Sequence, residues 1–418
     1  MDPEILQIGA TILFAAAIIH TFSVKFFNKL AHRQSTHAGI WHLLAEVEVV
    51  FGFWAMVLII YLALSGSVST SLGYLESRDF TEPMFIFAVM VVAASRPILN
   101  VSLVLVDRVS RLLPLAPPIA MFFVTLWLVP LLGSFITEPA AMTLAALLLR
   151  DRFYSAGLSR RLQYATIAVL FVNISIGGTL TPYAAPPVLM VADTWKWDLL
   201  FMMQNFGWRA ALAAFVNAAG ITWLFRKELR GIVLKQNSNG VKTPIGLVFV
   251  HLLLLVGIVV FAHHPIVFSW LFLFFMGIAT AYPQFQNRLI LREGLLVGFF
   301  LAGLVVLGGQ QQWWLQPLLA QMSPTILYYG AIVLTAITDN AALTYLGSLV
   351  DGLSSASRYS LVAGAVTGGG LTVIANAPNP AGYSILKGSF RNETIDASGI
   401  FLSALLPTFV VILAFWFL

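Results

Sequence analysis

The stretch Gly133-Ser-Phe-Ile-Thr-Glu-Pro-Ala-Ala-Met-Thr143 recurs in the second half of the chain as Leu334-Thr-Ala-Ile-Thr-Asp-Asn-Ala-Ala-Leu-Thr344. A second pair of similar segments follows: Gly177-Gly-Thr-Leu-Thr-Pro-Tyr-Ala-Ala-Pro-Pro187 in one half, and Gly368-Gly-Gly-Leu-Thr-Val-Ile-Ala-Asn-Ala-Pro378 in the other. Each copy of the first segment carries one carboxylate in an apolar setting, Glu138 or Asp339. A motif that recurs in the same order indicates an internally duplicated chain.

The composition is that of an integral membrane protein. Of the 418 residues, 59% are hydrophobic and only 10% are charged, and the mean hydropathy is +0.88. In lipid the backbone must satisfy its own hydrogen bonds, so we expect an all-α polytopic membrane protein. The chain has no cysteine, which excludes disulfides and thiolate metal sites.

Ten stretches are apolar and long enough to cross a bilayer. These predicted spans are about 5–25, 38–64, 83–106, 162–192, 207–225, 244–262, 266–283, 294–309, 357–386 and 398–418. The polar stretch 226–243 is too short to fold alone and is interpreted as a cytoplasmic linker between the repeats 1–225 and 244–418.

The distribution of Lys and Arg predicts the orientation. Cytoplasmic loops of membrane proteins are rich in both residues. With the N-terminus and the C-terminus outside, most of the 23 Lys and Arg fall in cytoplasmic loops. The net charge of +5 then reflects topology, and no nucleic-acid partner is needed to explain it. We expect the lipid bilayer of a bacterial inner membrane as the surroundings.

Two further apolar stretches, about 113–150 and 317–350, are predicted to be re-entrant hairpins. The first has basic clusters at both ends, so a hairpin that enters and leaves on the cytoplasmic side suits it better than a single span. The second has no basic cluster at either end and would open outward. Five spans plus one hairpin in each half give an inverted repeat. The alternative is twelve ordinary, kinked spans.

Two of the predicted spans should be broken in the middle. Gly177-Gly178 and the following prolines interrupt 162–192, and Gly368-Gly-Gly370 with Pro378 interrupts 357–386. Such breaks leave free backbone carbonyls in the membrane, and carbonyl and carboxylate oxygens suit a hard cation. The candidate proton- or cation-binding residues are Asp339, Glu138, Asn340, Thr338, Thr137, Thr181, Thr372 and Asn376.

We place a Na⁺ ion at Asp339, Thr338 and Asn340, because this copy of the motif has more neutral oxygens. Helix capping is the simpler alternative for both acids. For the threonines the simpler alternative is a hydrogen bond to their own helix backbone.

Other charged residues also fall inside predicted spans, among them Glu46, Glu48 and Arg96. Glu46 and Glu48 could form a proton path or a structural pair. Arg96 should have a carboxylate partner, because a lone charge in a membrane is costly. Glu46, Glu48 or Glu138 could be that partner, and contact with an anionic substrate is the alternative.

At these residues the chain resembles the ion transporter superfamily, which includes sodium/proton antiporters of the NhaD type, arsenite transporters and sodium–dicarboxylate symporters. Ile-Thr-Glu138-Pro and Ile-Thr-Asp339-Asn stand where the symporters carry Ser-Asn-Thr, and the Gly-Gly-x-Leu-Thr segments are similar to the broken-helix motif. Glu138 and Asp339, at the turns or tips of the two predicted hairpins, are carboxylates where the symporters have neutral residues. This departure favours a cation as the transported ion. The resemblance also implies a homodimer formed through the scaffold.

The leading hypothesis is a secondary transporter, not an enzyme, that exchanges Na⁺ or Li⁺ for protons at Asp339 and Glu138. It needs no cofactor beyond the transported ions. A symporter that couples Na⁺ or H⁺ to an organic or oxyanion substrate is the alternative. A channel or a non-transporting scaffold is a third possibility, against which the duplicated tips weigh.

Overall fold

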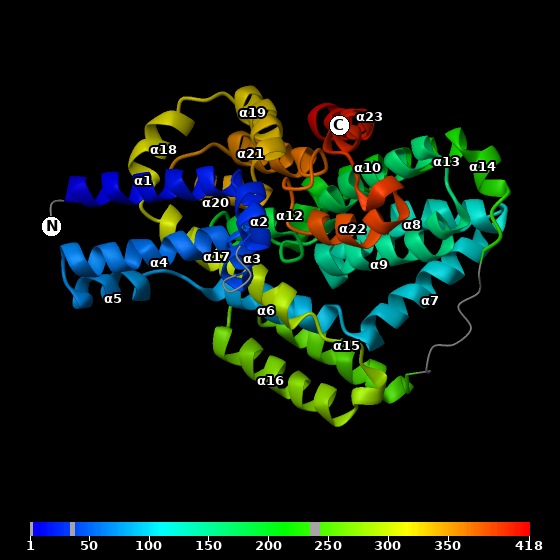
Figure 1. Ribbon diagram of the computed structural model, residues 1–418, viewed down its shortest axis with the longest axis horizontal. Coiled ribbons are helices and arrows are strands. Elements are labelled where there is room, and N and C mark those ends of the chain that lie inside the picture. The colour runs from blue at the N-terminus through cyan, green and yellow to red at the C-terminus, as the bar shows by residue number, and fades with distance from the viewer. Residues whose placement is uncertain (1–2, 34–37, 235–242) are drawn as a thin grey trace.

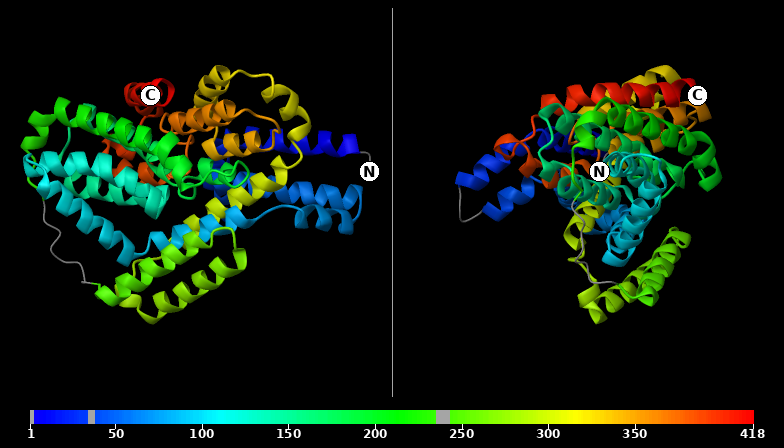
Figure 2. Two further views of the ribbon diagram at one scale, coloured as in Figure 1. Left: turned by 180° about the vertical axis from the view of Figure 1, so that it is seen from behind. Right: turned by 90° about the vertical axis from the view of Figure 1, so that its right-hand side faces the viewer.

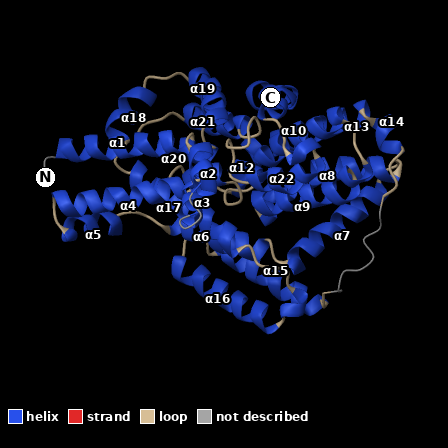
Figure 3. Cartoon of the chain, in the orientation of Figure 1, coloured by secondary structure: helices blue, strands red, loops and turns tan. Residues whose placement is uncertain are grey.

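In the computed structural model, residues 3–33, 38–234 and 243–418 are described, and every regular element in these ranges is a helix (Figures 1 and 3). The helices of the first half are α1 Pro3–Thr21, α2 Val24–Arg33, α3 Ala38–Leu44, α4 Val47–Ser65, α5 Val68–Glu76, α6 Thr81–Ala93, α7 Arg96–Leu112, α8 Pro117–Ile136, α9 Glu138–Arg152, α10 Arg160–Gly177, α11 Pro186–Ala192, α12 Leu199–Met202, α13 Trp208–Leu224 and α14 Arg226–Arg230.

The second half continues with helices of similar length. They are α15 Ile245–Val260, α16 Pro265–Ala281, α17 Leu291–Gly308, α18 Gln312–Leu319, α19 Pro324–Ile337, α20 Asn340–Ser348, α21 Ser355–Gly368, α22 Asn379–Leu386 and α23 Ala397–Phe417. Short 3₁₀ or π segments are Tyr154–Ala156, Gly178–Leu180, Met203–Gly207, Pro283–Phe285, Lys387–Ser389 and Arg391–Glu393.

Length and composition confirm an all-α polytopic membrane protein. Within the described ranges, six helices are long and apolar enough to cross a membrane, or seven when the bent pair α6 and α7 counts as one span. The six are Glu48–Ser65, Pro117–Ile136, Arg160–Leu180, Leu199–Leu224, Leu291–Gly308 and Ala397–Phe417. Four shorter apolar helices accompany them: Leu6–Thr21, Ile245–Val260, Pro265–Ala281 and Pro324–Ile337.

Two of the predicted continuous spans are interrupted in the structure. The stretch 38–64 is divided between α3 and α4. The stretch 83–106 is divided between α6 and α7, which meet at 64°. Ser95 is extended at this bend, and Pro97 lies in the first turn of α7. Proline has no N–H to donate to a preceding turn, so it suits the start of a new helix better than the interior of a long one.

Both predicted broken helices are interrupted at their glycines. The first is α10, a 3₁₀ turn at Gly178–Leu180, an irregular stretch and then α11. The second is α21, the irregular stretch 369–378 and then α22. Both breaks are buried, which is where irregular backbone is tolerated in a membrane protein.

The two halves interlock at the centre of the molecule (Figure 1). Helix α11 of the first half packs against α20 of the second, and α22 of the second half packs against α9 of the first. A hydrogen bond also joins the two halves: the hydroxyl of Ser175 on α10 donates to the carbonyl of Val366 on α21 at 2.7 Å. Gly370 allows this crossing, because a Cβ there would lie 2.4 Å from the Cα of Val172.

Helices at the periphery cover this centre. Helix α4 packs between α1 and α17, whereas α15 and α16 form an antiparallel pair along one edge, attached through α6 and α7 (Figures 1 and 2). The outer faces of this pair expose large apolar side chains such as Phe249, Trp270 and Phe274. Apolar outer faces are what a lipid environment requires.

Candidate functional site

The first tip is the turn between α8 and α9, and Thr137 is the only residue in it. Thr137 is fully buried and has φ 70° and ψ 150°. Glycine tolerates this backbone region and a β-branched residue does not, so the conformation costs about 1–3 kcal/mol. The sharp turn makes Glu138 the first residue of α9, with Pro139 next to it in the first turn.

The Glu138 side chain reaches from the first half of the chain into the second. It is fully buried, and its Oε2 accepts a hydrogen bond of 3.0 Å from Nδ2 of Asn376. The break in α10 packs directly on the carboxyl group, because a Cβ at Gly178 would lie 2.5 Å from Oε1. Within the described part of the chain, Oε1 has no hydrogen-bond partner.

The second tip has the same residue order and a different geometry. Thr338 is extended, with φ −132° and ψ −168°, and Asp339 is the N-cap of α20. One oxygen, Oδ1, accepts from the N–H groups of Ala341 at 2.8 Å and Ala342 at 3.2 Å. Its own helix therefore satisfies part of the Asp339 carboxylate.

Asp339 and Thr338 line a cavity of about 340 Å³ with apolar walls. Phe14, Phe51 and Phe300 bring aromatic rings to it from α1, α4 and α17. Among the described residues that line this cavity, Asp339 alone is ionisable. The two acids thus differ in access: Asp339 faces an open space, and Glu138 is enclosed by protein.

Threonines tie both helix breaks to the tips. Thr181 donates to the carbonyl of Ser134 at 2.7 Å, and Thr372 donates to the carbonyl of Ala336 at 2.9 Å. Ser134 strengthens the first junction, because its hydroxyl donates to the Gly177 carbonyl and accepts from the Leu180 N–H. These threonine hydroxyls therefore have structural partners.

Buried amides gather around the second break. The N–H of Asn340 donates to the carbonyl of Ala375 at 3.2 Å, and Nδ2 of Asn379 donates to the carbonyls of Gly369 and Thr372. Asn340, Asn376 and Asn379 are each fully buried.

Several oxygens at this centre have no hydrogen-bond partner in the described ranges. They are Oδ1 of Asn340, Asn376 and Asn379, Oγ1 of Thr137 and Oε1 of Glu138. Each unsatisfied buried polar group costs about 1–3 kcal/mol, so a cluster of them calls for an explanation. Oxygen atoms without donors are the ligands that a hard cation takes.

Sequence analysis missed Asn379, Ser134 and Ser175. Ser175 and Asn379 adjoin the glycine motifs, whereas Ser134 lies in the first tip motif. For Ser175 and Asn379 the position next to a predicted break was the available signal, because freed carbonyls need nearby donors. In the described part of the chain no group of three or more His, Cys, Asp or Glu is arranged to hold a metal ion.

The remaining predicted charges lie on the helices around the centre. Glu46 accepts a hydrogen bond of 2.6 Å from Arg292 on α17, an arginine that the sequence analysis had not paired with it. Glu48 lies in the first turn of α4, within electrostatic range of Asp339. Arg96 begins α7, next to the bend, and its pairing with a carboxylate stays a prediction.

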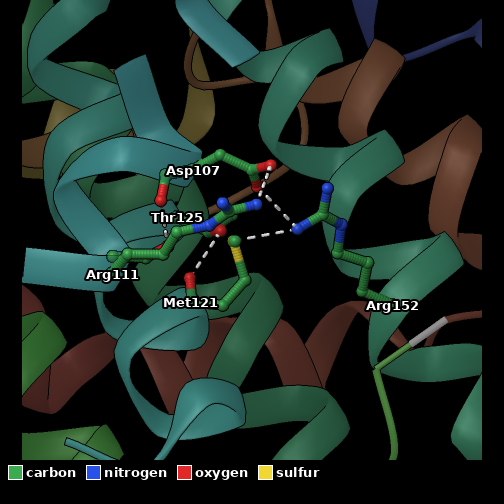
Figure 4. Close-up of polar contacts among 6 residues, drawn as sticks. Asp107, Arg111, Met121, Thr125 and Arg152 are labelled. Carbon is green, nitrogen blue, oxygen red and sulfur yellow. Dashed lines mark hydrogen bonds and ion pairs between the residues drawn. The ribbon is translucent and has the colours of Figure 1, made fainter. Parts of the chain in front are cut away.

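An ion pair fixes the far end of the first helix pair. Arg152 at the end of α9 bonds to Asp107 of α7 at 3.1 Å and to the sulfur of Met121 on α8 at 3.3 Å (Figure 4). Arg111 approaches the same carboxylate at 3.7 Å. The Arg152 side chain is only 14% exposed, so solvent screens the closer pair less than a surface pair. It holds α7, α8 and α9 together away from the tip.

These features define a polytopic α-helical membrane protein with one carboxylate, Glu138, buried between two interlocked halves and a second, Asp339, beside a cavity. A family model described as "Putative Na+/H+ antiporter" matches residues 5–418, so the chain belongs to that family. The resemblance to sodium/proton antiporters is thereby confirmed, and the protein is a membrane transporter. No curated protein sequence matches the chain.

Proposed function

We propose that the protein exchanges Na⁺ or Li⁺ for protons at Asp339 and Glu138 by alternating access. The observation that carries this proposal is the buried Glu138 carboxylate, bonded to Asn376 of the other half beside oxygens without partners in the described chain. A buried carboxylate needs a proton or a cation to neutralise it. The two ions therefore compete for one group, and this competition couples their flows.

In this proposal the cation binds first at Asp339, with Thr338 and Asn340 as further ligands. Asp339 lines the open cavity, and the neighbouring Asn340 carries an amide oxygen that has no partner among the described residues. Thr137, Glu138 and Asn376 would bind at the enclosed side, and Thr181 and Thr372 would supply further oxygens. Glu48 would pass protons between Asp339 and the Glu46–Arg292 pair.

The helix pairs α8–α9 and α19–α20 would be re-entrant hairpins of an inverted repeat, within the domains 1–225 and 244–418. Their reciprocal packing supports this proposal: α11 lies against the second tip helix, and α22 lies against the first. The hairpins and broken helices would move together against the surrounding spans. By resemblance the protein would work as a homodimer in a bacterial inner membrane, with both termini outside.

Proton release in liposomes tests the exchange. The purified protein is reconstituted with a pH-sensitive dye inside, and Na⁺ or Li⁺ is added with no organic anion present. We expect cation-driven proton movement that Asp339→Asn abolishes. Proton movement that begins only when an organic or oxyanion is added would overturn the proposal in favour of a symporter. Currents far above carrier rates would indicate a channel.

A further inference from the structure

A short helical excursion, α2 and α3, connects two neighbouring apolar helices. Helix α1 packs against α4, and each contains an apolar stretch, Leu6–Thr21 in one and Glu48–Ser65 in the other. Helices α2 and α3 pack on each other and turn away from the axes of these two helices (Figures 1 and 2). If α1 and α4 cross the bilayer, the excursion lies at its surface.

The excursion exposes apolar side chains instead of burying them. None of the residues of α3, all of which are described, is buried, and Ile40 is 57% exposed. On the α2 side Phe22 is 56% exposed and Phe26 is 61% exposed. An inner face does exist, because Ala31 is buried and the ring of Phe27 stacks on Trp41. Helices α2 and α3 therefore have a packed inner side and an exposed apolar side.

The charge of this part of the chain is entirely basic. From Ile5 to Ala45 the sequence contains no Asp or Glu, and it contains Lys25, Lys29 and Arg33 at four-residue intervals. Lys29 is exposed. Exposed aromatic residues beside basic residues on one amphipathic helix are typical of segments that lie in a membrane interface.

His20 holds the excursion in place at its base. Nε2 of His20 bonds to the carbonyl of Leu44 at 3.0 Å, and Nδ1 accepts from the indole N–H of Trp54 at 3.1 Å. With one nitrogen donating and the other accepting, the ring is neutral. The bond to Leu44 joins the end of α1 to the end of α3, so the helix pair is anchored and does not hang freely.

We propose that α2 and α3 form an interfacial element that binds the headgroups of anionic phospholipids. Phe22 and Phe26 enter the boundary of the acyl chains, and the net positive charge of the sequence from Ile5 to Ala45 attracts the anionic headgroups. Each Lys or Arg near an anionic membrane surface strengthens binding about five-fold. This element makes the protein sensitive to the anionic lipid content of its membrane, whatever ion it transports.

Lipid-specific quenching tests this surface. Because the chain lacks cysteine, Ile40→Cys gives one labelling site on α3 for an environment-sensitive fluorophore. The full-length protein is placed in nanodiscs that contain spin-labelled phosphatidylglycerol or spin-labelled phosphatidylcholine. We expect the anionic lipid to quench at a lower mole fraction. The preference should fall about 10-fold or more in the triple variant Lys25→Gln, Lys29→Gln, Arg33→Gln.

A matched triple variant on α14, Arg226→Gln, Lys227→Gln, Arg230→Gln, should keep the preference. Raising the salt concentration to about 0.5 M should weaken the lipid preference of the protein without charge substitutions. This test does not depend on whether the triple variants fold. Equal quenching by the two lipids, or no quenching by either, would overturn the proposal. So would an equal loss of preference in the α14 variant.

Discussion

The two tips of this protein are copies of one motif that fold differently. At the first, a strained Thr137 directs Glu138 across to Asn376 in the other half. At the second, an extended Thr338 leaves Asp339 as an ordinary N-cap beside a cavity. A duplicated sequence thus supplies one enclosed acid and one accessible acid. Because the two carboxylates have different partners, substitutions can separate their roles.

The largest effect should follow Asp339→Asn. Asn is as good an N-cap as Asp, so α20 should remain folded while the accessible charge is lost. We expect cation-driven proton release in liposomes to fall about 100-fold or more, since the carboxylate loses its charge towards the bound cation, at a cost of about 2–5 kcal/mol. Asp351→Asn is the control, because that exposed carboxylate bonds to Gln312 outside the cavity. Unchanged exchange in Asp339→Asn would show that Asp339 only caps its helix.

Glu138→Gln tests whether the enclosed acid also exchanges ions. Gln can still accept from Asn376, so the link between the halves should survive. We expect exchange to be lost while the protein remains monodisperse in detergent. Exchange that persists with fewer protons moved per cation, measured from the reversal potential, would instead make Asp339 the sole exchanging group.

Asn376→Ala should destabilise the protein more than Thr372→Val does. Removing the amide leaves Oε2 of the buried Glu138 without its donor, at a cost of about 1–3 kcal/mol. Thr372 loses only one bond to a carbonyl, at about 1 kcal/mol. Thermal unfolding in detergent gives the order. A Thr372→Val variant less stable than Asn376→Ala would show that the break matters more than the cross-half bond.

Replacing Thr137 or Thr338 with glycine should change stability differently. Thr137→Gly relieves a backbone strain of about 1–3 kcal/mol and should be neutral or stabilising. Thr338→Gly has no strain to relieve and should destabilise by about 1 kcal/mol, because glycine loses more freedom on folding. The same unfolding assay reports both. Equal losses in the two variants would mean that the first tip is not strained.

The smallest effect on transport should come from Asp396→Asn. This substitution removes the charge of an acid that caps a helix outside the cavity, and it keeps a good capping residue. Asp396 is an exposed N-cap of α23, and hydrogen bonds from the Ser398 hydroxyl and the Gly399 N–H lower its pKa. A lowered pKa means that its contribution to stability is present above the pKa of the unfolded chain and is lost as the pH falls through the folded value.

Asp396→Asn should therefore flatten the acid side of the unfolding profile slightly and leave ion exchange unchanged. A large loss of exchange would contradict the distinction between a capping acid in water and Asp339 at the cavity.

Sequence patterns were sufficient for the overall class and for the position of the two helix breaks. Hydropathy predicted an all-helical membrane protein, and the glycine motifs located both helix breaks, because a helix cannot pass glycine pairs and prolines without cost. Span boundaries were less well predicted. Hydropathy is indifferent to direction, so it treated 83–106 as one span; Pro97 was the local signal for the 64° bend between α6 and α7.

The sequence by itself determined that two acids lie in apolar surroundings, each followed by a helix break. Only the tertiary structure decided their partners. Glu138 and Asn376 are far apart in the chain and meet because the halves interlock, and Glu46 meets Arg292 because α4 packs on α17. Local sequence sets backbone preferences over a few residues. The choice of partner depends on packing between distant helices, where burial makes each unpaired polar group costly and so selects its neighbours.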